Sequence, residues 1–192
     1  FRKNHVVPIE DVRDSGLVKD RIVLAPAAVQ GEVTADTTFV RLAVQKTLEF
    51  EQRWDAYAAQ QGEAPVKPAL VVQLPDERSD DGEFLELVRA VIDAITQEWP
   101  GLVAANIVHT FAERAPIDLG SHRAVRYMPP QAIQDATHVR VVLAKNASTP
   151  GWDCPRAEVL VSLRASMDYT PIAQLIGRIV RQPLARRTRR AQ

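Results

Sequence analysis

The chain has 192 residues, of which 46% are hydrophobic and 25% are charged, the profile of a globular protein with one sizeable core. Its 24 basic and 24 acidic residues give a formal net charge of zero, which argues against a globally basic nucleic-acid-binding protein. No apolar run approaches the length needed to span a bilayer, and the polar start lacks a signal peptide's apolar segment. Together with the single cysteine, Cys154, these features predict a cytoplasmic protein without a membrane partner. Because the chain begins at Phe1 without Met, we also expect it to be a piece of a longer protein.

Turn residues and hydrophobic periodicity divide the chain into alternating strands and helices. Strands are predicted over residues 6–9, 21–25, 69–73, 102–108, 138–144 and 158–163. Helices are predicted from Thr34 or Asp36 to Gln61, from Asp80 or Asp81 to Pro100, and from Thr170 to Pro183. A polar loop over residues 112–123 and a short helix after Pro129 are predicted between the second helix and the later strands.

The predicted strands are apolar along their whole length, which is typical of a parallel sheet that is covered on both faces. Strands of this kind in alternation with helices predict an α/β fold, a three-layer αβα sandwich with a mostly parallel sheet. Residues 1–35 are irregular and are interpreted as an inter-lobe arm or linker, whereas residues 36–192 form one lobe.

The last predicted helix carries two arginines in the stretch QLIGRIVR, residues 174–181. Arg178 and Arg181 are three positions apart, so on a helix they project from one face and can grip phosphate oxygens together. Gly177 costs a helix about 1 kcal/mol relative to Ala, and such a Gly usually marks close approach by something else. The alternative is an ordinary amphipathic helix with exposed arginines.

A second candidate is the loop from Lys145 to Asp153, which follows the buried strand that ends at Ala144. Open α/β sheets bind ligands at the carboxyl ends of their parallel strands, which is where this loop begins. The alternative is a loop in which Asp153 caps local backbone and Trp152 fills the core. We favour the core for Trp152 and a role on the nucleotide side for Asp153.

In this order, the stretches PGWDCP (residues 150–155) and QLIGRIVR resemble motifs V and VI of superfamily 2 helicases and translocases. The resemblance covers residues 65–185 and implies a second RecA-like lobe. It is greatest to the type III restriction-enzyme branch, in which Gly-Trp-Asp is typical, although Pro150 stands where that branch often has an acidic residue. Gln174, in place of the His of DEAD-box proteins, points away from that subgroup. Residues 15–20 resemble the connection between the two lobes.

The resemblance implies the roles of individual residues. At the ATP site it assigns arginine fingers to Arg178 and Arg181 and ATP contacts to Gly151, Asp153, Gln174 and Gly177. It implies that Lys145 and Thr149 contact the backbone of DNA, with RNA as an alternative. The basic residues 186–190 are either a solvated end or a further phosphate contact.

Two motifs of a complete ATPase are missing from the sequence. It has no Gly-x-x-x-x-Gly-Lys-Ser/Thr loop to cradle phosphates and no Asp-Glu-x-His box to hold Mg²⁺. The resemblance therefore implies that ATP and Mg²⁺ are held mainly by a preceding RecA-like lobe, and this piece alone is not expected to hydrolyse ATP. The alternative function is a non-catalytic nucleic-acid-binding or scaffold module. The four histidines show no metal-ligand spacing, and Cys154 is expected to be a small packed hydrophobe.

Overall fold

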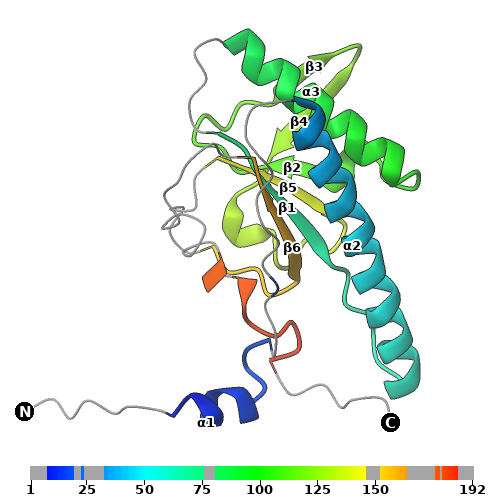
Figure 1. Cartoon of the computed structure of the whole chain (residues 1–192), viewed down its shortest axis with the longest axis vertical. Helices are drawn as coiled ribbons and strands as arrows, with labels where there is room; N and C mark the ends of the chain where they lie inside the picture. Colours follow the sequence, from blue (N-terminus) through cyan, green and yellow to red (C-terminus); the bar gives the residue numbers. More distant parts are fainter. Residues whose placement is uncertain are drawn as a thin grey trace, which may run out of the picture.

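The computed structural model describes residues 8–19, 23, 33–75, 81–145, 152–163, 176, 177 and 179–185 (Figure 1). The strands are β1 (Ala69–Gln73), β2 (Ile107–His109), β3 (Ile117–Gly120), β4 (Arg123–Tyr127), β5 (Val141–Ala144) and β6 (Ala157–Ser162). The helices are α1 (Ile9–Asp14), α2 (Val33–Gln61) and α3 (Asp81–Glu98), with short 3₁₀ turns η1 (Ala104–Asn106) and η2 (Pro130–Ala132). The predicted α/β fold class is confirmed.

The six strands form one sheet in the order β3-β4-β2-β5-β1-β6. All neighbours are parallel except β3 and β4, which form an antiparallel hairpin at one edge. Strand β1 lies between β5 and β6, with Leu70 opposite Val141 on one side and Val159 on the other. Every residue of β1 is buried, as expected for a central strand whose two faces are both covered. The mostly parallel sheet with flanking helices is consistent with a RecA-like three-layer sandwich.

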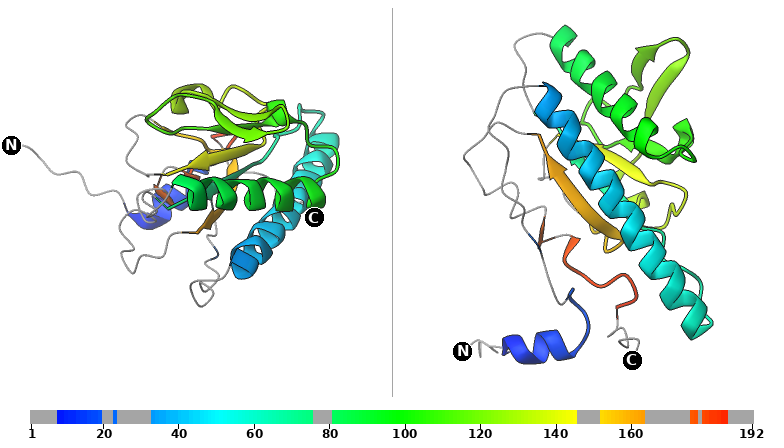
Figure 2. Two further views of the ribbon diagram at one scale, coloured as in Figure 1. Left: turned by 90° about the horizontal axis from the view of Figure 1, so that it is seen from above. Right: turned by 45° about the vertical axis from the view of Figure 1, so that its right-hand side comes forward.

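Helices α2 and α3 lie side by side against one face of the sheet (Figure 2). The apolar residues of α3 recur at spacings of three and four, so they form one stripe that faces the sheet. This first core includes the buried residues Val40, Val44, Leu70, Val72, Leu87, Val88, Val91, Ile95 and Leu143. The prediction that α3 buries one apolar face is confirmed.

The opposite face of the sheet carries a second, smaller core. Val71, Val108 and Val142 of the sheet pack with Ile133, Val139, Trp152, Cys154 and Ala157. Ile179, next to the helical residues 176 and 177, also packs against this cluster. Among the described residues, the covering layer includes η2, residues 152–156 and the helical residues near 179, so parts of the two candidate stretches lie on the same face.

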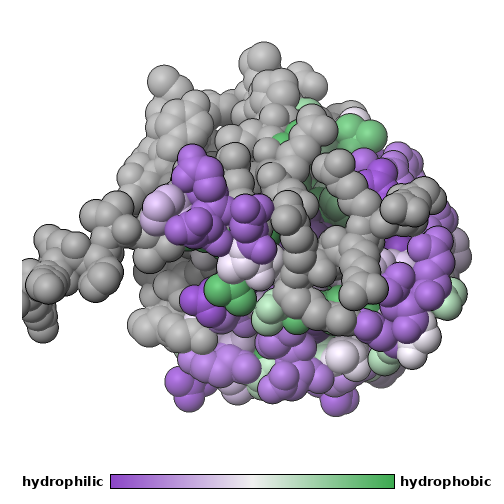
Figure 3. Space-filling view, turned by 90° about the horizontal axis from the view of Figure 1, so that it is seen from below, coloured by the Kyte–Doolittle hydropathy of each residue, from purple (hydrophilic) through white to green (hydrophobic). Residues whose placement is uncertain are grey.

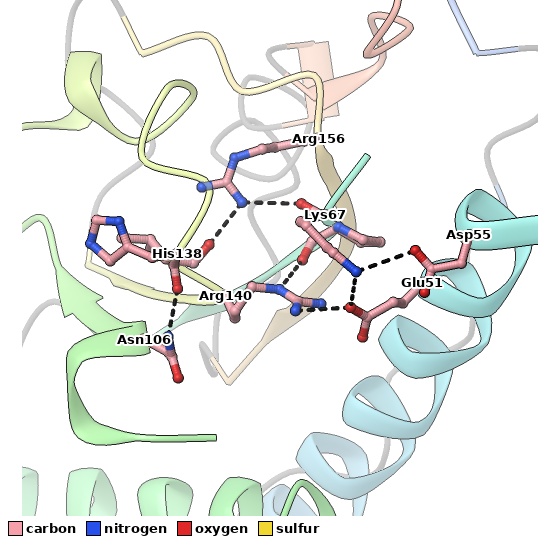
Figure 4. Close-up of polar contacts among 9 residues, drawn as sticks. Glu51, Asp55, Lys67, Asn106, His138, Arg140 and Arg156 are labelled. Atoms are coloured by element: carbon pink, nitrogen blue, oxygen red, sulfur yellow. Dashed lines mark hydrogen bonds and ion pairs between the residues drawn. The ribbon is translucent and has the colours of Figure 1, made fainter. Parts of the chain in front are cut away.

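The amino-terminal edge of the sheet is fastened to α2 by a charged network (Figure 4). Arg140 donates to the carbonyl of Pro68 at 3.0 Å and to Glu51 at 3.0 Å, and Lys67 contacts Glu51 at 3.1 Å and Asp55 at 3.2 Å. Burial raises the pKa of the Glu51 carboxyl, but hydrogen bonds from the two cations outweigh it and leave a lowered pKa. Glu51 is therefore held ionised, and the network ties α2 to the strands that begin at this edge.

Several boundaries differ from those predicted. Helix α2 begins at Val33, so Thr34 and Asp36 lie inside it and do not precede it as N-caps. Its predicted end is confirmed: Gly62 has a φ of 66°, and the amide of Glu63 donates to the Ala58 carbonyl at 3.0 Å, which closes the last turn.

Two predicted strands and one predicted loop also differ from the structure. Ile9 belongs to α1, so the strand predicted over residues 6–9 is wrong at that residue. The strand predicted over 102–108 is shorter and later, because η1 precedes β2. The polar loop predicted over 112–123 contains β3 and leads directly into β4, a hairpin that the sequence did not indicate.

Candidate functional site

The structure brings together Asp153 and Arg181, one from each candidate stretch. A guanidinium nitrogen of Arg181, Nη1, donates a hydrogen bond to Oδ2 of the Asp153 carboxylate. Asp153 lies between Trp152 and Cys154, which are 3% and 0% exposed and so fix its backbone against the second core. Both charged side chains nevertheless reach solvent, at 63% exposure for Arg181 and 41% for Asp153. The pair is therefore a surface ion pair in which the backbone of Asp153 is held by its two buried neighbours.

The second oxygen of the Asp153 carboxylate has a different environment. Oδ1 is buried and has no hydrogen-bond partner among the described residues. A buried carboxylate oxygen without a donor is costly, so such an atom normally finds a partner when the site is complete. Oδ1 is therefore an unused acceptor, which a hydroxyl or amide from elsewhere can reach only if the atoms that cover it move.

The backbone of Arg181 pairs with the N-terminal segment. Val18 and Arg181 form an antiparallel bridge, in which the amide of Lys19 donates to the Val180 carbonyl at 2.6 Å. The amide of Gln182 donates to the Leu17 carbonyl at 2.9 Å. Residues 17–19 and 180–182, far apart in the sequence, thus lie side by side near α1 (Figure 1).

Seen from below, the surface of the molecule shows mainly hydrophilic described side chains, with smaller hydrophobic areas among them (Figure 3).

Lys19 was not among the predicted site residues, yet its backbone belongs to this pairing and its side chain contacts two further segments. Its ammonium donates to the carbonyls of Ala157 at 2.9 Å and Ile179 at 2.6 Å, and lies 3.4 Å from Oε2 of Glu158. The other Glu158 oxygen accepts a hydrogen bond from the indole of Trp54 at 3.1 Å. Burial lowers the pKa of Lys19, and Glu158 opposes that shift. The one signal in the sequence was the resemblance of residues 15–20 to an inter-lobe connection, which indicated no contact.

Lys145, a predicted nucleic-acid contact, lies at the carboxyl end of β5. Its ammonium is 4.3 Å from the ring centre of Phe84 and 4.9 Å from that of Phe111, which are cation–π distances. His109 at the end of β2 is buried, and its Nδ1 accepts a hydrogen bond from the Phe111 amide at 3.2 Å. Burial lowers the pKa of His109, so the imidazole is neutral at pH 7. Lys145 therefore lies over two aromatic rings at the carboxyl edge of the sheet. It directly follows β5, in agreement with its predicted position after a strand that ends at Ala144.

Gly177 is exposed, and a Cβ added there would meet no atom within 4 Å. No close approach by the described part of this chain therefore explains the glycine. The predicted site residues Arg178, Gln174, Gly151 and Thr149 lie outside the described residues, and their roles stay predictions.

Arg156 is a second residue that the sequence did not single out. It is 2% exposed, and its guanidinium donates to five backbone carbonyls at 2.6–3.2 Å. These carbonyls belong to Lys67, Ile133, Gln134, Ala136 and Val139. The contact with the Lys67 carbonyl is drawn in Figure 4. All five donors of the guanidinium thus have acceptors, which fastens residues 152–156 to the segment after η2 and to the start of β1.

The described residues limit the chemistry of the site. They contain no group of three or more His, Cys, Asp or Glu side chains that could hold a metal ion. Burial raises the pKa of Cys154, so its thiol is a protonated packing group, as expected. In the described part of the chain, no helix is both long and apolar enough to cross a bilayer.

Comparisons with protein-family models, curated proteins and solved structures find no match for this chain.

Proposed function

We propose that this chain is the C-terminal motor lobe of an ATP-dependent DNA helicase or translocase, similar to the type III restriction-enzyme branch. The observation that carries the proposal is the Asp153–Arg181 pair. Its two residues come from separate stretches that the resemblance assigns to one nucleotide site. An ordinary amphipathic helix after an ordinary loop gives no reason for these two side chains to meet.

The exposure of Arg181 supports a role in phosphoryl transfer. A 63% exposed guanidinium with a surface carboxylate partner can exchange that partner for phosphate oxygens at little cost. Positive charge at the transferring phosphoryl group stabilises the negative charge that develops there. Arg178 enters the proposal through its helical spacing from Arg181, and Gln174 and Gly177 through the same motif.

Asp153 positions Arg181 in this proposal. Its Oδ2 holds Arg181 in place before a nucleotide arrives, and a ribose hydroxyl would reach the buried Oδ1 only after the atoms that cover this oxygen move. Gly151 would allow the nucleotide to approach this loop. ATP itself and Mg²⁺ would be held mainly by the phosphate loop and acidic residues of a preceding RecA-like lobe, because this sequence contains neither of those two motifs.

The nucleic-acid role rests on Lys145 and Thr149, which follow β5. The ammonium of Lys145 lies over two aromatic rings at the carboxyl edge of the sheet. From there it can contact phosphate oxygens, which give affinity for nucleic acid without reading its sequence. We therefore propose a cytoplasmic motor that moves along DNA, or RNA, with little sequence preference in this lobe.

The test is nucleic-acid-stimulated ATPase activity of the intact protein, compared among wild type, Arg178→Ala and Arg181→Ala. Loss of an electrostatic contact to the transferring phosphoryl group lowers kcat by about 10²–10³-fold, whereas DNA binding should persist. Arg53→Ala is the matched control, because Arg53 is 67% exposed on α2 and far in sequence from both motifs. An intact protein without ATPase activity, or two arginine variants with wild-type rates, would favour the scaffold function instead.

A further inference from the structure

Three segments of the chain meet at the ammonium of Lys19. The first is residues 17–19 themselves, which pair with residues 180–182 through backbone hydrogen bonds. The second is the segment that carries Asp153, reached through the carbonyl of Ala157. The third is the segment that carries Arg181, reached through the carbonyl of Ile179. A single side chain therefore bridges both halves of the Asp153–Arg181 pair.

The bonding at Lys19 is complete and shielded. An ammonium has three N–H donors, and the carbonyls of Ala157 and Ile179 and the carboxylate of Glu158 provide three acceptors. The side chains of Lys19 and Glu158 are only 14% and 8% exposed, so water competes weakly for these contacts. Glu158 is fixed from its other side by the indole of Trp54 on α2. The ammonium is thus anchored to the body of the fold and not only to neighbouring loops.

We propose that Lys19 is a positioning residue that sets the place of Arg181 relative to Asp153 and so couples the N-terminal arm to the candidate nucleotide site. The consequence for ATP hydrolysis rests on the proposed function, whereas the positioning itself does not. Movement of residues 17–19 would pull on residues 180–182 through the backbone pairing and on Ile179 through the ammonium. A change in the position of the arm can therefore influence Arg181 without contacting its side chain.

The first experiment measures positioning directly in the intact protein, by amide hydrogen exchange with peptides that cover residues 15–20 and 179–185. Lys19→Met keeps most of the aliphatic stem but removes all three donors, and we expect these peptides to exchange at least about tenfold faster. Peptides from β1 and β5 should be unchanged. Lys19→Arg retains charge and donors and should restore much of the protection. Lys46→Met, which removes an exposed ion pair on α2, is the control and should match wild type.

The second experiment asks whether Lys19 acts through Arg181. We expect Lys19→Met to lower the kcat of ATP hydrolysis about tenfold with little change in KM, because Arg181 is proposed to act in the transition state. In an Arg181→Ala background, Lys19→Met should have no further effect. An equal loss in both backgrounds would overturn the coupling to Arg181, since a generally weakened fold affects both alike.

The outcomes separate the two proposals. Unchanged exchange of residues 179–185 in Lys19→Met overturns the positioning role, whatever the ATPase result. A wild-type protein without ATPase activity overturns the proposed function, while faster exchange would still support positioning. If Lys19→Met does not fold, Glu158→Gln serves instead: it keeps an oxygen for Trp54 but removes the carboxylate from Lys19, and the same peptides should exchange faster.

Discussion

Arg156 and Arg181 use their guanidiniums in opposite ways. Arg156 is 2% exposed and gives its five donors to backbone carbonyls, so it cannot change partners without opening the fold. Arg181 is 63% exposed, and its described side-chain partner is one carboxylate oxygen. A guanidinium whose donors are all used internally holds a structure together. One that is exposed beside an acceptor is suited to exchange that acceptor for a ligand.

The largest effect on stability should follow from Arg156→Lys. An ammonium has three donors and cannot copy the planar fork, so several of the five buried or part-buried carbonyls would lose their partner. We expect the free energy of unfolding to fall by about 2–4 kcal/mol, measured from the urea midpoint. Arg53→Lys, at an exposed site on α2, is the control and should change stability by less than about 0.5 kcal/mol. A similarly small loss for Arg156→Lys would contradict the structural role of this residue.

His109 differs from both arginines, because it is buried and its imidazole can be either neutral or protonated. Burial lowers its folded-state pKa below the ordinary value of 6.5, so the folded state binds a proton less readily than the unfolded state. Stability should therefore fall as pH decreases below about 6.5, by at most about 1.4 kcal/mol per pH unit for one proton.

The measurement is the unfolding free energy of wild type and His109→Asn between about pH 7 and 5. The Asn oxygen can replace Nδ1 as acceptor for the Phe111 amide, so the variant should fold but lack this part of the pH dependence. Parallel curves for wild type and His109→Asn would show that His109 does not cause the acid sensitivity.

Much of the fold was predictable because the apolar runs that become buried strands begin directly after residues, such as Pro, that interrupt regular structure. Strand β1 was predicted at its observed bounds, since a continuous apolar run follows Pro65 and Pro68. The β3–β4 hairpin was missed for a physical reason: Ser121 and His122 form its turn at φ values of 53° and 61°. Asn-Gly or Asp-Gly usually marks such a turn, and neither is present.

The residues of the candidate site were predictable only where they belong to a short sequence motif. Asp153 and Arg181 were selected from short motifs, and the structure pairs them. Lys19 and Arg156 were missed because isolated charged residues are usually exposed, and their acceptors are backbone carbonyls far away in the sequence. Such carbonyls leave no residue-type signal, so only the folded chain reveals that these two cations are buried.

Gly177 allows stability to be separated from function at the candidate site. Its added Cβ would meet nothing within 4 Å, so Gly177→Ala should stabilise the chain by about 0.5–1 kcal/mol through helix propensity. If a nucleotide or facing lobe approaches this glycine, the same variant should lower the ATPase rate of the intact protein. Thermal unfolding and steady-state kinetics on one preparation measure both. A stabilised variant with a wild-type rate would remove Gly177 from the proposed site.

The smallest effect on stability is expected for Arg181→Ala, and that small effect is what distinguishes Arg181 from Arg156. Because both members of the Asp153–Arg181 pair are substantially exposed, their attraction is screened by solvent, and its loss should cost less than about 1 kcal/mol. Asp153→Asn should behave similarly, since Trp152 and Cys154 keep its backbone in place. Urea unfolding of the two variants and of Arg156→Lys gives the comparison directly. A loss of about 3 kcal/mol or more for Arg181→Ala would mean that this guanidinium is structural too, and a fall in ATPase rate could then no longer be attributed to phosphoryl transfer.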